Sequence, residues 1–160
     1  MTETLNILLL ILVANGAPVM VSYLVSHKLS LPVDFGYKLK DQQYIFGNTK
    51  TWRGLNSSLF LTGVMALLLG YDFGFGLVIA VLAMSGDLIS SFIKRRLKKE
   101  SSSQVLLLDQ LPESVLPVMI LLWLNRIDLT QVIVIVVSFF IIELVLSSAL
   151  FHLGVRKRPY

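Results

Sequence analysis

The stretch "GFGLVIAVLAMSGDLISSFIKRR", residues 74–96, determines how this chain is organised. It begins as a continuous apolar run of the kind that enters a bilayer, and it ends in three consecutive cations. Between them stands Asp87, about two helical turns before the basic end. A charge inside a membrane helix is costly, so it normally faces protein, water or a cation. The stretch therefore predicts a membrane helix with a paired or functional carboxylate.

The composition extends this interpretation to the whole chain. Of the 160 residues, 55% are hydrophobic and only 15% are charged, compared with about 25% charged in a typical soluble domain. No internal repeat or linker divides the chain, so we expect a single transmembrane domain over residues 1–160. The absence of cysteine excludes a disulfide framework and a thiol nucleophile. The predicted fold is an all-α integral membrane protein with five transmembrane helices, in residues 5–25, 55–71, 74–93, 111–124 and 129–153.

The basic residues predict the orientation of these helices. All but Arg126 of the 14 lysines and arginines lie in residues 26–53, 94–99 and 156–158. If these regions are cytoplasmic, the amino terminus is outside and five helices cross the cell (inner) membrane. Two cytoplasmic loops, residues 26–53 and 94–110, would then form the site on the cytoplasmic side. The fourth segment is short and contains two prolines, so its crossing needs local thinning of the bilayer.

The polar residues of the opening stretch fall on one stripe. Asp87, Ser91 and Lys94 are spaced i, i+4, i+7, with Arg95 beside them, so a carboxylate, a hydroxyl and an ammonium follow one another toward the cytoplasm. The alternative interpretation is a salt bridge at the helix end.

Asp109 precedes the fourth segment, which begins with Pro112 and Glu113 in its first turn. A helix start can hold an anion such as phosphate, and a carboxylate there can hold a metal against it. The alternative is an ordinary capping aspartate.

The first loop contains "FGNTKTWRG", residues 46–54, without the spacing of a P-loop. It combines phosphate-binding cations, a hydroxyl, an aromatic ring and a glycine that allows close backbone approach: Lys50, Arg53, Thr51, Trp52 and Gly54. A basic juxtamembrane loop that ends in an interfacial tryptophan is the alternative.

Two further polar residues lie inside apolar segments. Asn15 precedes Gly16 and Pro18 in the first segment, where its amide could pack between helices or reach a ligand. Glu143 lies in "FFIIELVLSS" and is a candidate for helix association or proton handling.

Together these motifs closely resemble the CDP-archaeol synthase family, a branch of the CTP-dependent cytidylyltransferases that also include phosphatidate cytidylyltransferase. The resemblance covers nearly the whole chain in order. The motifs are Asn15-Gly16-Ala17-Pro18, Asp34-Phe35-Gly36, Phe46-Gly47, Lys50-Thr51-Trp52-Arg53-Gly54, Gly86-Asp87, Ser91, Lys94-Arg95-Arg96 and Leu108-Asp109-Gln110.

The resemblance implies an enzyme that transfers a cytidylyl group from CTP to a membrane lipid phosphate monoester and releases pyrophosphate, with Mg2+ as cofactor. It implies Asp87 and Asp109 as metal ligands, with Lys50 and Lys94 as further catalytic residues. The expected partners are CTP, the lipid phosphate and the bilayer, with no nucleic acid, and a homodimer stays open. The substrate-binding residues implied are Asn15, Thr51, Trp52, Arg53, Gly54, Ser91, Arg95 and Arg96.

The chain departs from the phosphatidate branch at two points. Arg53 stands in place of a glutamate, and the second aspartate that follows the Asp109 position in that branch is missing, so that Glu113 is the nearest carboxylate. Two other classes remain as alternatives. A small transporter would use Asn15, Asp87 and Glu143 to line a path, and a membrane scaffold would need the basic loops for topology alone.

Overall fold

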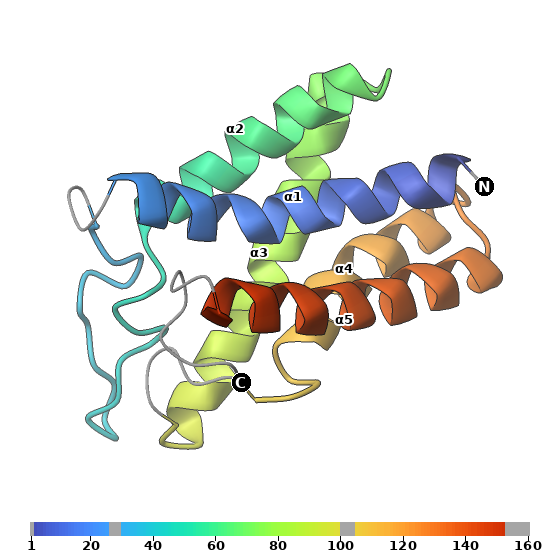
Figure 1. The fold of residues 1–160 in the computed structure, drawn as a ribbon. Helices are drawn as coiled ribbons and strands as arrows, with labels where there is room; N and C mark the ends of the chain where they lie inside the picture. The colour runs from blue at the N-terminus through green and yellow to red at the C-terminus, as the bar shows by residue number, and fades with distance from the viewer. Residues whose placement is uncertain (1, 26–29, 100–104, 153–160) are drawn as a thin grey trace.

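The computed structural model describes residues 2–25, 30–99 and 105–152, so Lys28, residues 156–158 and the end of the fifth predicted segment lie outside the described residues. Within them every predicted apolar segment is a helix, which confirms the all-α fold (Figure 1). The helices are α1 (Thr2–Val25), α2 (Trp52–Leu68), α3 (Phe73–Arg96), α4 (Gln110–Trp123) and α5 (Leu129–His152).

α1 is the central helix of the bundle, because it contacts each of the other four. It lies beside α5, while α3 crosses behind both in the view of Figure 1. Their shared apolar core includes Ile11 of α1, Ile79 of α3, Val118 of α4 and Phe139 of α5, all fully buried. Ala66 of α2 belongs to the same cluster, so all five helices bury one continuous core, as expected of a single packed unit.

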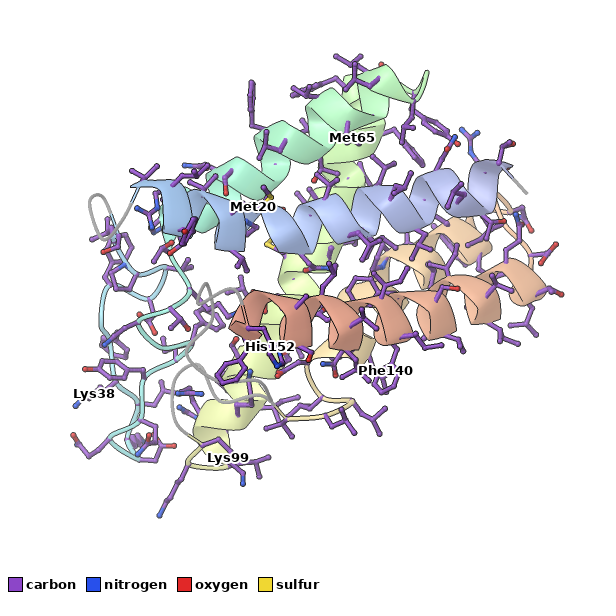
Figure 2. The ribbon with its side chains drawn as sticks, viewed as in Figure 1. Met20, Lys38, Met65, Lys99, Phe140 and His152 are labelled. Carbon is purple, nitrogen blue, oxygen red and sulfur yellow. The ribbon has the colours of Figure 1, made fainter. Side chains whose placement is uncertain are left out.

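Polar contacts tie three segments together at one end of the bundle. Thr4 Oγ1 near the start of α1 accepts a hydrogen bond from Gln131 Nε2 of α5 at 2.9 Å. Asn6 Nδ2 donates to Tyr71 Oη in the α2–α3 turn at 3.5 Å. The two basic loops lie at the other end, where Figure 2 shows Lys38 and Lys99 extending from them. All described loop cations except Arg126 therefore share one end, although the side of the membrane that it faces stays a prediction.

The backbones of α3 and α4 approach each other closely at Gly86. A Cβ atom added there would lie 2.1 Å from the Pro112 carbonyl oxygen and 2.7 Å from the Glu113 nitrogen. Only a residue without a side chain permits this approach. Because Asp87 follows Gly86 and Glu113 follows Pro112, the contact brings both carboxylates to the same crossing.

In the part of the chain that the structure describes, three helices are long and apolar enough to cross a membrane: α1, α3 and residues Leu129–Ala149 of α5. Their outward faces carry mostly apolar side chains (Figure 2). α4, with 14 residues, is about 21 Å long, which is short of a bilayer core of about 30 Å. The short fourth segment of the sequence is thus also a short helix, and its full crossing stays a prediction.

We expect Gly86→Ala to destabilise the fold, because the new methyl group collides with backbone atoms that cannot rotate away. Overpacking of this kind costs about 1–3 kcal/mol. Gly16→Ala in α1 is the matched control, since no atom lies within 4 Å of the added Cβ and alanine favours a helix. Thermal unfolding in detergent should show a lower midpoint for Gly86→Ala alone, and equal midpoints would contradict the contact.

Candidate functional site

The first ion pair of the site joins the first loop to α3. Lys50 Nζ lies 2.5 Å from Asp87 Oδ1, and the two side chains are 24% and 16% exposed. Lys50 directly precedes Thr51, the residue that caps α2, so the start of α2 directs the lysine toward α3. Asp87 is therefore paired across two segments, and not with a basic residue at the end of its own helix.

The second ion pair joins the end of α3 to the start of α4. Lys94 Nζ lies 2.6 Å from Asp109 Oδ1, and both side chains are largely buried. Asp109 makes no side-chain capping bond to α4, and its Oδ2 accepts a hydrogen bond from Val105 N at 3.0 Å. Its carboxylate thus faces the end of α3, which argues against an ordinary capping aspartate. Arg95 is close enough to act on Asp109 electrostatically.

Glu113 and Glu143 extend the acidic side of the site. Glu113 is buried on the first turn of α4, and its carboxyl group is close enough to Asp87 for the two to interact electrostatically. Glu143 of α5 acts electrostatically on Glu113. The sequence placed Glu113 near Asp109, but it carried no signal that Glu143 would come near either residue.

A buried carboxylate holds the first loop in shape. Asp34 accepts hydrogen bonds from the backbone nitrogens of Gly36 at 3.0 Å, Phe46 at 2.9 Å and Gly47 at 3.0 Å. Burial by itself would raise its pKa, but these three donors outweigh it, and the pKa of Asp34 lies below its ordinary value of 3.8. The motifs around Asp34 and Gly47, which are twelve or more residues apart, therefore form one turn that presents Lys50.

Lys50 stays protonated in this setting. Burial lowers its pKa, but the nearby carboxylates of Asp87 and Glu113 outweigh burial, so the pKa of Lys50 lies above its ordinary value of 10.5. The stabilising contribution of its ion pair is therefore fully present below pH 10.5, and it is lost as the pH rises through the raised pKa. At neutral pH the site carries this cation permanently.

Arg96 connects the end of α3 to the first loop. Its guanidinium donates to the carbonyl of Tyr44 at 2.6 Å and lies 3.4 Å from Asp41 Oδ2. It also lies over the Phe92 ring, at 4.9 Å from the centroid. The structure thus gives Arg96 a loop-holding contact, and its predicted contact with substrate stays a prediction.

The remaining residues of the first-loop motif sit at the start of α2. Thr51 Oγ1 accepts a hydrogen bond from Gly54 N at 3.2 Å and so caps the helix. A Cβ at Gly54 would lie 3.2 Å from Pro18, so this glycine allows α1 and α2 to approach. Trp52 is exposed, and its ring centroid lies 6.4 Å from that of Phe35. Arg53 is half-buried.

Asn15 lies on α1, where its Nδ2 donates to Ile11 O at 3.1 Å. Its Oδ1 is buried and accepts no hydrogen bond from the described residues. The neighbouring Ala14 packs against Ala80 and Ala83 of α3, on the apolar side of Asp87. No described contact joins Asn15 to the two ion pairs, so its predicted role in substrate binding stays a prediction.

The oxygen atoms of the site suit a Mg2+ ion that arrives with phosphates. Among the described residues, no three His, Cys, Asp or Glu side chains form a ready-made metal cluster. Mg2+, however, usually takes only one or two protein carboxylates and completes its shell with water and substrate phosphates. Ser91 Oγ, whose side chain is 2% exposed, has no hydrogen-bond partner in the described part of the chain. A buried hydroxyl without a hydrogen-bond partner, beside paired carboxylates, is consistent with a site that binds a polar ligand.

The fold places the chain with a class, the helical intramembrane enzymes, through its likeness to a solved structure. A solved structure described as an intramembrane enzyme for archaeal membrane lipid biosynthesis superposes on 89% of this chain and 91% of its own, with a TM-score of 0.76 and 25% identity.

Curated relatives extend the likeness to the sequence. A CDP-archaeol synthase from Thermofilum pendens is 34% identical over 92% of this chain and 76% of its own, and one from Sulfolobus acidocaldarius is 31% identical over 93% and 91%. One from Hyperthermus butylicus is 38% identical over 62% of this chain, and the alignment spans only 60% of that protein.

The family model described as CarS-like, CDP-archaeol synthase, matches residues 2–160, and the chain belongs to this family. Its members are CTP-using cytidylyltransferases of lipid biosynthesis, so the chain is a membrane transferase and not a transporter or a scaffold. The resemblance seen in the motifs is thereby confirmed.

We expect Asp34→Asn to loosen the first loop, because an amide has one oxygen where the carboxylate uses both for backbone donors. Hydrogen exchange at the amides of Phe46 and Gly47 should accelerate at least about tenfold, which corresponds to the loss of roughly one charge-assisted hydrogen bond. Asp41→Asn, on the exposed part of the same loop, should leave both amides protected. Unchanged exchange in Asp34→Asn would contradict the role of this carboxylate.

Proposed function

We propose that the chain transfers a cytidylyl group from CTP to the phosphate monoester of a membrane lipid. The observation that carries the proposal is the pairing of two lysines with two aspartates from separate segments at one end of the bundle. Lys50 comes from the first loop, Asp87 and Lys94 come from α3, and Asp109 precedes α4. A triphosphate and a phosphate monoester repel each other, and such a cluster of fixed cations can hold both.

In the proposed reaction an oxygen of the lipid phosphate attacks the α-phosphorus of CTP. The new bond makes the CDP-lipid, while the bond between the α-phosphorus and the bridging oxygen breaks and pyrophosphate leaves. The nucleophile is already an anion, so no strong base is needed. Lys50 and Lys94 would pair with the phosphates and stabilise the negative charge that moves onto the pyrophosphate.

Asp87 and Asp109 are proposed to hold the Mg2+ ion, which when bound supplies Lewis-acid stabilisation of the phosphates. Each aspartate is paired with a lysine, so the carboxylates and the phosphate-binding cations are already adjacent. Ser91, Arg95 and the first-loop residues from Thr51 to Gly54 would border the substrate.

An apolar groove beside the site supports a lipid as the acceptor. It has a volume of about 370 Å3 and lies between α3 and α4. Its lining consists of Ile89, Leu111, Pro112, Val115 and Leu116. Pro112 is bonded to Glu113, so the groove begins next to the buried carboxylates. A hydrocarbon chain that lies in this groove would keep the phosphate at the site while the lipid stays in the bilayer.

The decisive assay is the incorporation of radiolabelled CTP into lipid, with a panel of phosphate-bearing acceptors and with UTP as the competing nucleotide. We expect Mg2+-dependent transfer from CTP in preference to UTP, and poor reaction of acceptors without long chains. A purified protein that leaves every acceptor unlabelled would overturn the proposed function.

Asp87→Asn and Asp109→Asn should each lower the turnover number by at least about a hundredfold, because either loss disrupts the same metal and phosphate arrangement. The double variant should lose little more. Asp128→Asn, at the other end of the bundle, is the control, since asparagine also caps helices. Asp87→Asn, Asp109→Asn and the double variant should stay folded with a lowered unfolding midpoint, because each lysine loses its carboxylate. Asp128→Asn should keep the wild-type midpoint. Near wild-type turnover in either single variant would exclude that aspartate from the chemistry.

Val115→Trp should fill the apolar groove and raise the KM for a long-chain lipid phosphate several-fold, with the KM for CTP unchanged. A hydrocarbon chain that enters the groove leaves lipid surroundings of equal polarity. The groove therefore selects acceptor chains by shape more than by hydrophobicity. Val81→Trp is the matched control, because Val81 is exposed on α3 and is not part of the groove lining. Identical acceptor kinetics in the two variants would contradict this location for the chain.

A further inference from the structure

Three carboxylates converge on one ammonium group at the site. Lys50 Nζ contacts Asp87 directly, and the carboxylates of Glu113 and Asp109 are close enough to act on it electrostatically. Glu113 also reaches Asp87. Asp109 already has a lysine of its own, Lys94. Asp87 and Glu113 therefore share Lys50 as their nearest compensating cation, while Lys94 also acts on Asp87.

One ammonium between two carboxyl groups balances only one negative charge, so the second group keeps a proton or needs a further cation. Two carboxylates in contact repel each other unless a proton or a cation lies with them. An ammonium brings one positive charge and three donors, whereas a divalent ion brings two charges and binds carboxylate oxygens directly. The position of Lys50 Nζ is thus one that a small divalent cation can also satisfy.

The hydroxyl of Ser91 gives an independent indication of a ligand. Its neighbour Ser90 donates to the Asp87 carbonyl at 2.9 Å, as serines in helices often do. Ser91 Oγ makes no such bond among the described residues, although its side chain is 98% buried, and it lies one turn beyond Asp87 and three residues before Lys94. Both of these neighbours point into the site. A buried oxygen without a hydrogen-bond partner at this position indicates that a ligand binds there.

We propose that Glu113 joins Asp87 in binding the divalent cation, beside the part already proposed for Asp109, and that Lys50 occupies this position until the metal ion binds. Glu113 is then an additional metal ligand of this chain, supplied by α4 where the second aspartate of the phosphatidate branch is missing. On binding of Mg2+ and the triphosphate, Lys50 Nζ moves from the carboxylates to a phosphate. The identity of the nucleotide rests on the proposed function, but the exchange of one cation for another concerns these residues alone.

The exchange makes a counterintuitive prediction: removal of a cation from the site should improve metal binding. Binding of free Mn2+ by the purified protein without nucleotide is measured by electron paramagnetic resonance. Lys50→Met should bind Mn2+ at least about tenfold more tightly than wild type, because one unit of repulsion at contact distance is removed. Lys50→Met/Glu113→Gln and Lys50→Met/Asp87→Asn should lose this gain.

Lys40→Met is the matched control, since Lys40 is exposed on the same loop and its removal changes the net charge equally. It should leave Mn2+ affinity at the wild-type value. Equal affinities of Lys50→Met and wild type would overturn the exchange, and a gain that survives Glu113→Gln would remove Glu113 from the site. Turnover of the wild-type protein is measured separately. If the wild-type protein transfers the cytidylyl group, either result counts against the cation exchange and not against the proposed function.

A second measurement uses the wild-type protein, in case Lys50→Met does not fold. Amine labelling of Lys50 is followed by mass spectrometry during a Mg2+ titration, with Lys40 as the internal reference. Displacement of Lys50 from Asp87 should raise its labelling relative to Lys40 at least several-fold at saturating Mg2+. A constant ratio would overturn the proposal.

Discussion

The backbone contact between α3 and α4 at Gly86 is the constraint on which the rest of the site depends. A side chain at this position would overlap the Pro112 carbonyl, so the helices can meet here only because the residue is glycine. On α3, Asp87 and Ile89 flank Gly86 on opposite sides, since each residue advances about 100° around a helix. Glu113 and Val115 flank Pro112 in the same way. One crossing therefore gathers carboxylates on one side and apolar side chains on the other.

Carboxylates gathered in this way need cations, and the loops provide them. Lys50 reaches Asp87 only if the first loop is folded, and that fold depends on Asp34, whose carboxylate binds three backbone amides. Arg96 holds the same loop from the end of α3 through the Tyr44 carbonyl. The folding of the loop and the neutralisation of the buried charge are thus one event, which explains why charged residues are tolerated at this depth.

The helices could be predicted from the sequence because hydrophobic runs report length and burial directly. The predicted segments match the observed helices to within a few residues, and the stripe of Asp87, Ser91 and Lys94 follows from helical spacing alone. The partners were not predictable in this way. Nothing in the spacing indicates that Lys50 would meet Asp87, that Asp34 would hold Phe46 and Gly47, or that Glu143 would lie near Glu113. These contacts depend on crossing angles and loop paths, which local patterns do not encode.

The two faces of the α3–α4 crossing also suit a reaction between an ionic and a lipidic substrate. The groove with Ile89 and Val115 lies on the apolar face, and the paired charges lie on the opposite face, separated only by the backbones that meet at Gly86. In the proposed reaction the hydrocarbon chain and the phosphate of one lipid would lie on either side of this contact. The acceptor then needs no extraction from the bilayer, because a separation of a few bonds within the lipid matches the separation between the two faces. The same short distance explains why a small bundle, without a further domain in its described residues, can place a triphosphate site directly against hydrocarbon.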